Sequence, residues 1–215
     1  MSIKILGGLA GGLWLSTISE KELRPTSVIL RRKIFDAHQD LSGFIFVDLF
    51  AGTGAMGIEA WSRGADEVIL VEKHKKIASQ IERNLKILYQ KYPDLPVLLQ
   101  RVDAVKWLKD YYTNLLQDLK EKLETSLLQG VILFLDPPYQ QTFLYEESIL
   151  AVGYALREEA GMAAITQIWL EGDQQKARKL DEWRSWLKGT RNGIECSEVK
   201  SYKQSSHFMM ILRPN

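Results

Sequence analysis

The stretch from residue 44 to residue 61 constrains the fold of this chain more than any other. Residues 44–50 form an apolar run that is broken only by Asp48, as in a buried strand of a parallel sheet. Glycines follow at positions 52, 54 and 57, and a helical pattern begins at Ile58. Glycine permits a tight turn and a close approach of a ligand, and a helix N-terminus offers unpaired N–H groups. This order of strand, glycine-rich loop and helix predicts a nucleotide-type binding loop.

Apolar runs and helical patterns alternate along the rest of the chain. Strands are expected near residues 67–72, 97–101, 131–135 and 164–170, and helices near 75–92, 103–128, 145–158 and 174–188. Two further strands near 194–203 and 207–213 are candidates for a hairpin. The pattern predicts an α/β fold. It is a Rossmann-like, seven-stranded, mostly parallel sheet with a C-terminal antiparallel hairpin and helices on both faces.

Residues 1–38 precede this sheet and are expected to form an extension, with the main domain at 39–215. A glycine-interrupted stretch at 1–23 predicts a small hairpin, Pro25 interrupts the chain, and residues 27–37 predict a helix. Residues 1–36 carry six Lys and Arg against three Asp and Glu, a local charge of +3 in a chain whose net charge is +1. An anionic partner and a solvated helix face explain this excess about equally well.

The remaining composition narrows the setting of the protein. Cys196 is the only cysteine among 215 residues, so an internal disulfide is excluded. The chain has no apolar run long enough to cross a bilayer, and the glycine-rich run at 5–15 lacks a signal-peptidase motif. We therefore expect a cytoplasmic protein without a membrane partner. The three histidines, at 38, 74 and 207, are scattered and are interpreted as surface or packing residues, so no metal site is expected.

The glycine loop matches the G-x-G-x-x-G pattern of dinucleotide-binding proteins, with Glu72 placed to bind a ribose. An NAD-dependent oxidoreductase is therefore one possible reading. Asp48 favours another, because a carboxylate beside the loop repels a pyrophosphate and attracts the cationic S-adenosylmethionine. Glu72 would then accept hydrogen bonds from the ribose hydroxyls, and Asp103 one from the adenine amine.

The second motif is the turn Asp136-Pro137-Pro138-Tyr139, which follows an apolar strand directly. The two prolines stiffen the turn, so that Asp136 and the Pro137 carbonyl can both accept from one exocyclic amine. Tyr139 offers a face on which a base can stack. A carboxylate at position 136 suits the two donors of a guanine edge and modestly favours guanine over adenine. Adenine-N6 methylation of nucleic acid and a catalytically silent RNA-binding module remain open.

These motifs together resemble one family. The chain resembles class I methyltransferases that act on exocyclic amines. The resemblance rests on the glycine loop, Glu72 at the end of the second strand, Asp103-Ala104 and the D-P-P-Y turn. The segment Arg24-Pro25-Thr26-Ser27, followed by Arg31 and Phe35, narrows the resemblance to bacterial 16S rRNA guanine-N2 methyltransferases. The chain departs from that family at Val28-Ile29-Leu30, where charged residues are usual, and at Tyr202-Lys203-Gln204, where a glycine is common.

The resemblance implies transfer of a methyl group from S-adenosylmethionine to N2 of a guanine in 16S rRNA. The implied partner is 16S rRNA or the small ribosomal subunit, and we expect a monomer. The implied cofactor-binding residues are Asp48, Phe50, Gly52, Thr53, Gly54, Glu72, Lys73, Asp103 and Ala104. The implied catalytic residues are Asp136, Pro137 and Tyr139, and the implied RNA contacts are Arg24, Thr26, Arg31, Arg32 and Lys33.

Overall fold

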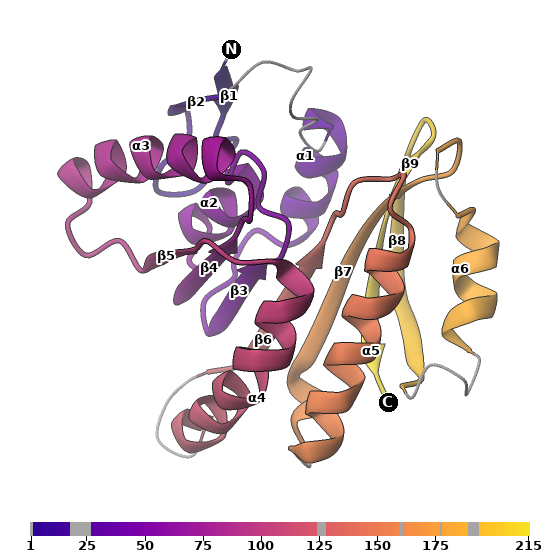
Figure 1. Ribbon diagram of the computed structural model, residues 1–215. Helices are drawn as coiled ribbons and strands as arrows, with labels where there is room; N and C mark the ends of the chain where they lie inside the picture. Colours follow the sequence, from indigo (N-terminus) through magenta and orange to yellow (C-terminus); the bar gives the residue numbers. More distant parts are fainter. Residues whose placement is uncertain (1, 18–26, 124–127, 160, 177, 189–193) are drawn as a thin grey trace. The chain divides into compact units, whose positions relative to one another are not determined.

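The computed structural model describes residues 2–17, 27–123, 128–159, 161–176, 178–188 and 194–215. Contacts divide the chain into two compact units, Met1–Asp103 and Ala104–Asn215. Figure 1 labels the helices and strands of both units. The expected extension at residues 1–38 falls inside the first unit, and its separate role stays a prediction.

The first unit holds a hairpin and a parallel set of strands. Its elements are β1 (Ser2–Lys4), β2 (Trp14–Ser16), α1 (Val28–Ala37), β3 (Phe44–Asp48), α2 (Ala55–Ser62), β4 (Glu67–Val71), α3 (Lys75–Lys91) and β5 (Val97–Gln100). β1 and β2 pair antiparallel, and β4 pairs parallel with both β3 and β5. The apolar runs of β3 and β4 are buried, as expected of strands covered on both faces.

The second unit begins with α4 (Ala104–Leu123) and contains the turn Asp136–Tyr139. Its other elements are β6 (Gly130–Leu135), α5 (Phe143–Glu158), the 3₁₀ helix η1 (Met162–Ile165), β7 (Thr166–Asp173), α6 (Leu180–Leu187), β8 (Cys196–Gln204) and β9 (His207–Pro214). β6 and β7 are parallel, whereas β9 is antiparallel to both β7 and β8.

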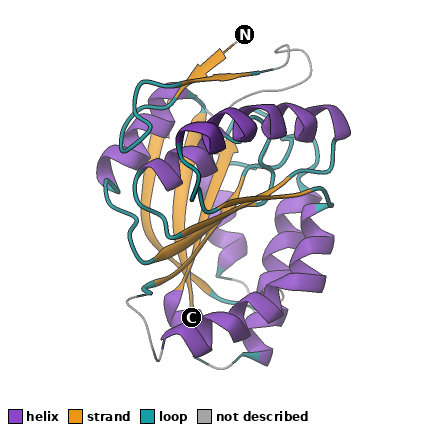
Figure 2. Cartoon of the chain, turned by 90° about the vertical axis from the view of Figure 1, so that its left-hand side faces the viewer, coloured by secondary structure: helices purple, strands orange, loops and turns teal. Residues whose placement is uncertain are grey.

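The seven main strands follow the order β5-β4-β3-β6-β7-β9-β8, and helices alternate with them along the chain. Figure 2 shows the strands in orange and the helices in purple. This confirms the predicted Rossmann-like sheet with its C-terminal antiparallel hairpin. The small hairpin expected near the N-terminus is also confirmed.

Two predicted boundaries in the second unit were wrong. Residues 164 and 165 lie in η1, and the strand begins only at Thr166. The helix expected from residue 174 begins at Leu180. The Asp173 carboxylate accepts a hydrogen bond from the Gln175 N–H at 2.9 Å and stabilises a turn there. An Asp side chain that bonds two residues ahead favours such a turn over a helix.

Candidate active site

Two carboxylates hold the glycine loop of the first unit. Oε2 of Glu72 accepts a hydrogen bond from the Gly52 N–H at 3.0 Å, and Oδ2 of Asp48 accepts one from the Gly57 N–H at 3.2 Å. Gly52 and Gly54 have φ values of 53° and 76°, in the left-handed region that favours glycine. The loop is therefore fixed at both ends by acids from the strands beside it.

The same hydrogen bonds bear on which ligand the loop accepts. A bound pyrophosphate needs free loop N–H groups, and here those of Gly52 and Gly57 donate to carboxylates. Asp48 is 1% exposed, and its hydrogen bond from the Gly57 N–H makes it a residue that braces the loop. The negative charge of these two acids opposes a phosphate and favours a cationic ligand.

The other residues predicted for the cofactor lie in or beside this loop, directly after β4, or after β5. Oε1 of Glu72 also accepts from the His74 N–H at 2.7 Å, and Nζ of Lys73 pairs with Oδ2 of Asp103 at 3.1 Å. Phe50 and Gly52 are half-buried, whereas the side chain of Thr53 caps the Ala55 N–H. Ala104, the first residue of α4, is buried and belongs to the second unit.

In the second unit the Asp136–Tyr139 turn joins β6 to α5. Asp136 is half-buried, Pro137 is buried and Pro138 is exposed. The Gln141 N–H donates to the Pro138 carbonyl at 2.8 Å and closes the turn. Tyr139 is 9% exposed, so protein already covers most of its ring. Little of the Tyr139 ring is therefore exposed for a base to stack on.

The Tyr139 hydroxyl meets residues that were not predicted for the site. It lies 3.4 Å from Oε1 of Glu171 and 3.3 Å from Nδ1 of His207. Nε2 of His207 is 3.8 Å from Oδ2 of Asp173. Glu171 follows an apolar run in the sequence, and the structure places it inside β7. His207 belongs to the second strand of the predicted C-terminal hairpin, and the antiparallel pairing of that strand with β7 sets His207 opposite Asp173.

Tyr145 completes this group of ionisable residues. Its hydroxyl donates to the Glu171 carbonyl at 2.8 Å. Burial raises the pKa of Tyr145 well above its usual value, and the charges of Asp136, Glu171 and Asp173 raise that pKa further. Tyr145 is therefore neutral at physiological pH and acts as a fixed hydrogen-bond donor to β7.

The residues predicted to contact RNA divide into three groups. Arg24 and Thr26 lie outside the described residues. Arg32 and Lys33 are exposed on α1 and keep the predicted role as a proposal. Arg31 does not fit that role: its side chain is fully buried and its Nη2 donates to the Lys4 carbonyl at 2.6 Å. Burial lowers the pKa of Arg31, an effect that the charge of Glu59 partly offsets.

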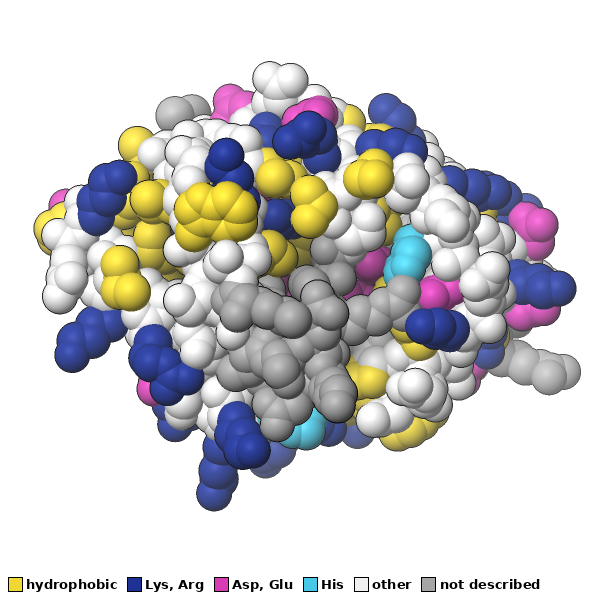
Figure 3. All heavy atoms as spheres, turned by 90° about the horizontal axis from the view of Figure 1, so that it is seen from above, with side chains coloured by type: hydrophobic (Ala, Val, Ile, Leu, Met, Phe, Trp, Pro, Cys, Tyr) yellow, Lys and Arg dark blue, Asp and Glu magenta, His cyan; other side chains and the backbone are white. Residues whose placement is uncertain are grey.

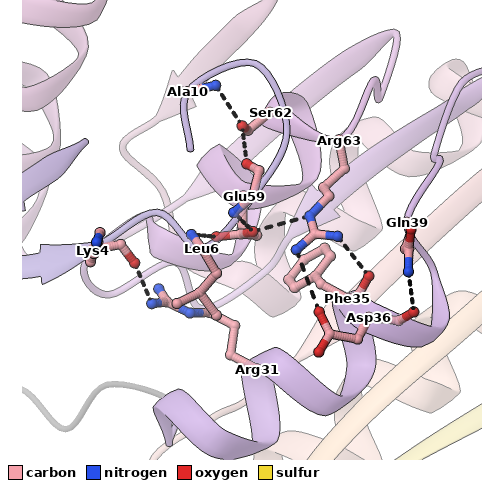
Figure 4. Close-up of polar contacts among 11 residues, drawn as sticks. Lys4, Leu6, Ala10, Arg31, Phe35, Asp36, Gln39, Glu59, Ser62 and Arg63 are labelled. Atoms are coloured by element: carbon pink, nitrogen blue, oxygen red, sulfur yellow. Dashed lines mark hydrogen bonds and ion pairs between the residues drawn. The ribbon is translucent and has the colours of Figure 1, made fainter. Parts of the chain in front are cut away.

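Glu59 on α2 connects the helix that follows the glycine loop to the N-terminal hairpin (Figure 4). Its fully buried carboxylate accepts from the N–H groups of Leu6 at 2.6 Å and Gly7 at 2.9 Å, and from Nε of Arg63 at 3.1 Å. Nη1 of Arg63 donates to the Phe35 carbonyl of α1 at 2.9 Å. The Glu59 carboxylate thus ties Leu6 and Gly7 directly to the helix that follows the glycine loop. Through Arg63 it also reaches Phe35 of α1.

Neither the surface charge nor the potential metal ligands among the described residues point to a further site. On the face seen from above in Figure 3, Lys and Arg side chains are spread among hydrophobic and acidic ones, in keeping with the net charge of +1. Across the described residues, no group of three or more His, Cys, Asp or Glu could hold a metal ion. No helix within the same ranges is long and apolar enough to cross a membrane.

Comparison with known proteins shows the family to which this chain belongs. The model of the family described as conserved hypothetical protein 95 matches residues 3–200. The ribosomal RNA small subunit methyltransferase D of Buchnera aphidicola (strain Bp) is 31% identical over 153 residues, which are 70% of this chain and 68% of the relative. Its namesake in Haemophilus influenzae is 27% identical and matches 89% of this chain and 90% of the relative.

A solved structure of the Escherichia coli protein yhhF shares the fold. It matches 100% of this chain and 99% of its own, with a TM-score of 0.66 at 20% identity. The resemblance noted from the sequence motifs is confirmed at the level of the family, since the matched relatives are named as small-subunit rRNA methyltransferases. The chain belongs to the conserved hypothetical protein 95 family, together with these bacterial rRNA methyltransferases.

Proposed function

We propose that the protein transfers a methyl group from S-adenosylmethionine to the exocyclic N2 amine of a guanine in small-subunit rRNA. The observation that carries the proposal is the pair of carboxylates on the glycine loop, which occupy two of its N–H groups and favour a cationic ligand. The names of the relatives support the reaction class and the RNA substrate. A cytoplasmic location and a monomeric state belong to the same proposal.

The first unit would bind the cofactor. Glu72 is the best placed of its acids, because it lies beside Gly52 and can share its oxygens with ribose hydroxyls. Asp48 would act indirectly, by holding the loop through Gly57. Lys73 and Asp103 form an exposed ion pair, and Asp103 could accept from an adenine amine beside that pair. S-adenosylmethionine supplies an activated methyl group on a sulfonium, and no other chemistry is required of it.

The second unit would hold the acceptor base. The N2 amine of guanine is a poor nucleophile because its lone pair is delocalised, so alignment and electrostatic support must lower the barrier. Asp136 and the Pro137 carbonyl would accept from the amine and stabilise positive charge as the C–N bond forms and the C–S bond breaks. The excess proton then leaves the nitrogen for water. A target base must leave its stack to be reached in this way.

The test combines cofactor binding with product analysis. Calorimetry with S-adenosylmethionine and with NAD compares the two ligands that fit a glycine loop, and binding of NAD alone would refute the proposal. The protein is then incubated with S-adenosylmethionine and either 16S rRNA or small subunits that lack the modification. Nucleoside mass spectrometry should find N2-methylguanosine. Finding N6-methyladenosine instead would assign the adenine reaction, and finding no methylation with either substrate would favour a silent RNA-binding module.

Variants of the acceptor turn sharpen this test. Asp136→Ala should keep the affinity for S-adenosylmethionine and lose most turnover, because it removes the acceptor for the amine and leaves every residue proposed to bind the cofactor unchanged. The matched control is Asp118→Ala, which removes an exposed carboxylate from α4 of the same unit. Equal turnover of Asp136→Ala and Asp118→Ala would discard the role of Asp136.

A further inference from the structure

The hydroxyl of Tyr139 is held by a polar group that the proposed reaction does not itself require. It lies 3.4 Å from Oε1 of Glu171 and 3.3 Å from Nδ1 of His207. A phenol has a single proton to donate, and a carboxylate only accepts. If that proton goes to Glu171, the phenol oxygen is left to accept a hydrogen bond from Nδ1–H of His207. In this arrangement the phenol donates to Glu171 and accepts from His207.

The backbone places His207 for this contact. β7 and β9 pair antiparallel with Asp173 opposite His207, so the position of the imidazole is set by the sheet register. Its Nε2 lies 3.8 Å from Oδ2 of Asp173, and its Nδ1 lies 3.8 Å from Oε1 of Glu171. Both carboxylates are fully buried, whereas 15% of the His207 side chain is exposed. The imidazole thus lies beside two buried acids, with Nε2 nearest Asp173 and Nδ1 nearest the Tyr139 hydroxyl and Glu171.

The Tyr139 ring is therefore restrained from its hydroxyl end. The imidazole and phenol centroids are 6.0 Å apart at an interplanar angle of 56°. Tyr145 adds rigidity, because its hydroxyl binds the Glu171 carbonyl at 2.8 Å and holds β7 in place. The four residues come from the turn, α5, β7 and β9, so the restraint is tertiary and does not depend on the turn alone.

We propose that His207 is a positioning residue of the methyltransferase: through Nδ1 it fixes the Tyr139 ring, and thereby the place of the acceptor base. This inference rests on the proposed function and adds a residue to it. A ring that loses this restraint still covers the site but aligns the base less well. The effect therefore falls on kcat more than on the KM for RNA, because small misplacements affect the transition state most.

The experiment is a double-mutant cycle on the full chain with Tyr139→Phe and His207→Leu. Each single variant should lower kcat about 3- to 10-fold, the range expected for one hydrogen bond, with unchanged affinity for S-adenosylmethionine. The double variant should be no slower than Tyr139→Phe, because without the hydroxyl His207 has nothing to position. Independent effects that multiply in the double variant would overturn the inference.

A conservative variant separates positioning from packing. His207→Asn keeps an N–H donor near the place of Nδ1 and should recover most of the kcat that His207→Leu loses. Equal loss in both variants would assign His207 a packing role and reject the proposal. Arg213→Ala, an exposed residue at the far end of β9, controls for general effects on that strand. Urea unfolding of every variant confirms that rates are compared between folded proteins.

The reaction of the wild-type protein distinguishes a failure of the proposed function from a failure of the role proposed for His207. If the wild-type protein methylates no guanine in either RNA substrate, the proposed function fails and this inference falls with it. If the wild-type protein methylates guanine and the cycle shows independent effects, the function stands and only the role of His207 is rejected.

Discussion

Replacing Glu59 with alanine should be among the most damaging single changes in the first unit. The substitution removes the acceptor for three donors, the N–H groups of Leu6 and Gly7 and the Nε of Arg63. Each part-buried N–H left without a partner costs about 1–3 kcal/mol. Breaking a buried ion pair from one side costs about 3–5 kcal/mol. Because these losses overlap, we expect a decrease of about 3–5 kcal/mol in the free energy of unfolding.

Urea denaturation followed by tryptophan fluorescence measures this loss. With a slope of about 2–3 kcal/mol per molar urea, the transition midpoint should fall by about 1–2 M. Glu59→Gln retains one carbonyl oxygen but no charge for Arg63, so its midpoint should lie between wild type and Glu59→Ala. The control Asp94→Ala removes an exposed carboxylate of the same unit and should change stability by less than about 0.5 kcal/mol.

A loss of less than about 1 kcal/mol in Glu59→Ala would refute the reasoning, because that is what a single ordinary hydrogen bond contributes. It would mean that water or other groups satisfy the N–H donors of Leu6 and Gly7 once the carboxylate is gone.

Three further predictions concern the glycine loop, the basic residues of α1 and the thiol of Cys196. Gly57→Ala should lower the melting temperature and weaken S-adenosylmethionine binding, because a Cβ there would lie 2.3 Å from Cδ2 of Leu70 and overpacking costs about 1–3 kcal/mol. In RNA titrations at several salt concentrations, Arg32→Ala and Lys33→Ala should each reduce the salt slope by about 1, whereas Arg31→Met should leave the slope unchanged and lower the urea midpoint. Burial raises the pKa of the Cys196 thiol to about 12, so a thiol reagent at pH 8 should label Cys196 only after urea is added; rapid labelling of the native protein would contradict this.

The glycine loop could be predicted from the sequence because its determinants are local. The apolar run of β3, the glycines and the start of α2 follow one another within residues 44–62, and each imposes its own backbone conformation. The contact of Asp48 was harder to predict. Its charge was recognised, but the donor it meets, the Gly57 N–H, is set by how the loop folds back on the strand.

Contacts between distant segments could not be predicted from the sequence. The sequence around Arg31 is typical of an exposed basic residue on an amphipathic helix. In the structure the Arg31 side chain is buried and donates to the Lys4 carbonyl. His207 was interpreted as a surface or packing residue, and its contact with Tyr139 spans 68 positions of the chain. Neither burial nor register across such separations is encoded in a local pattern, so both needed the folded structure.

The position of β9 has a consequence for how the protein is made. In the sheet β9 lies between β7 and β8, although it follows both in the chain. During synthesis one edge of β7 stays open until residues 207–214 have emerged, and an open strand edge is a template for wrong pairing. The first unit can already collapse on its own contacts by then, since domains fold from the N-terminus as they appear. A nascent chain stalled before His207 would thus carry a formed glycine loop and an unfinished, aggregation-prone half.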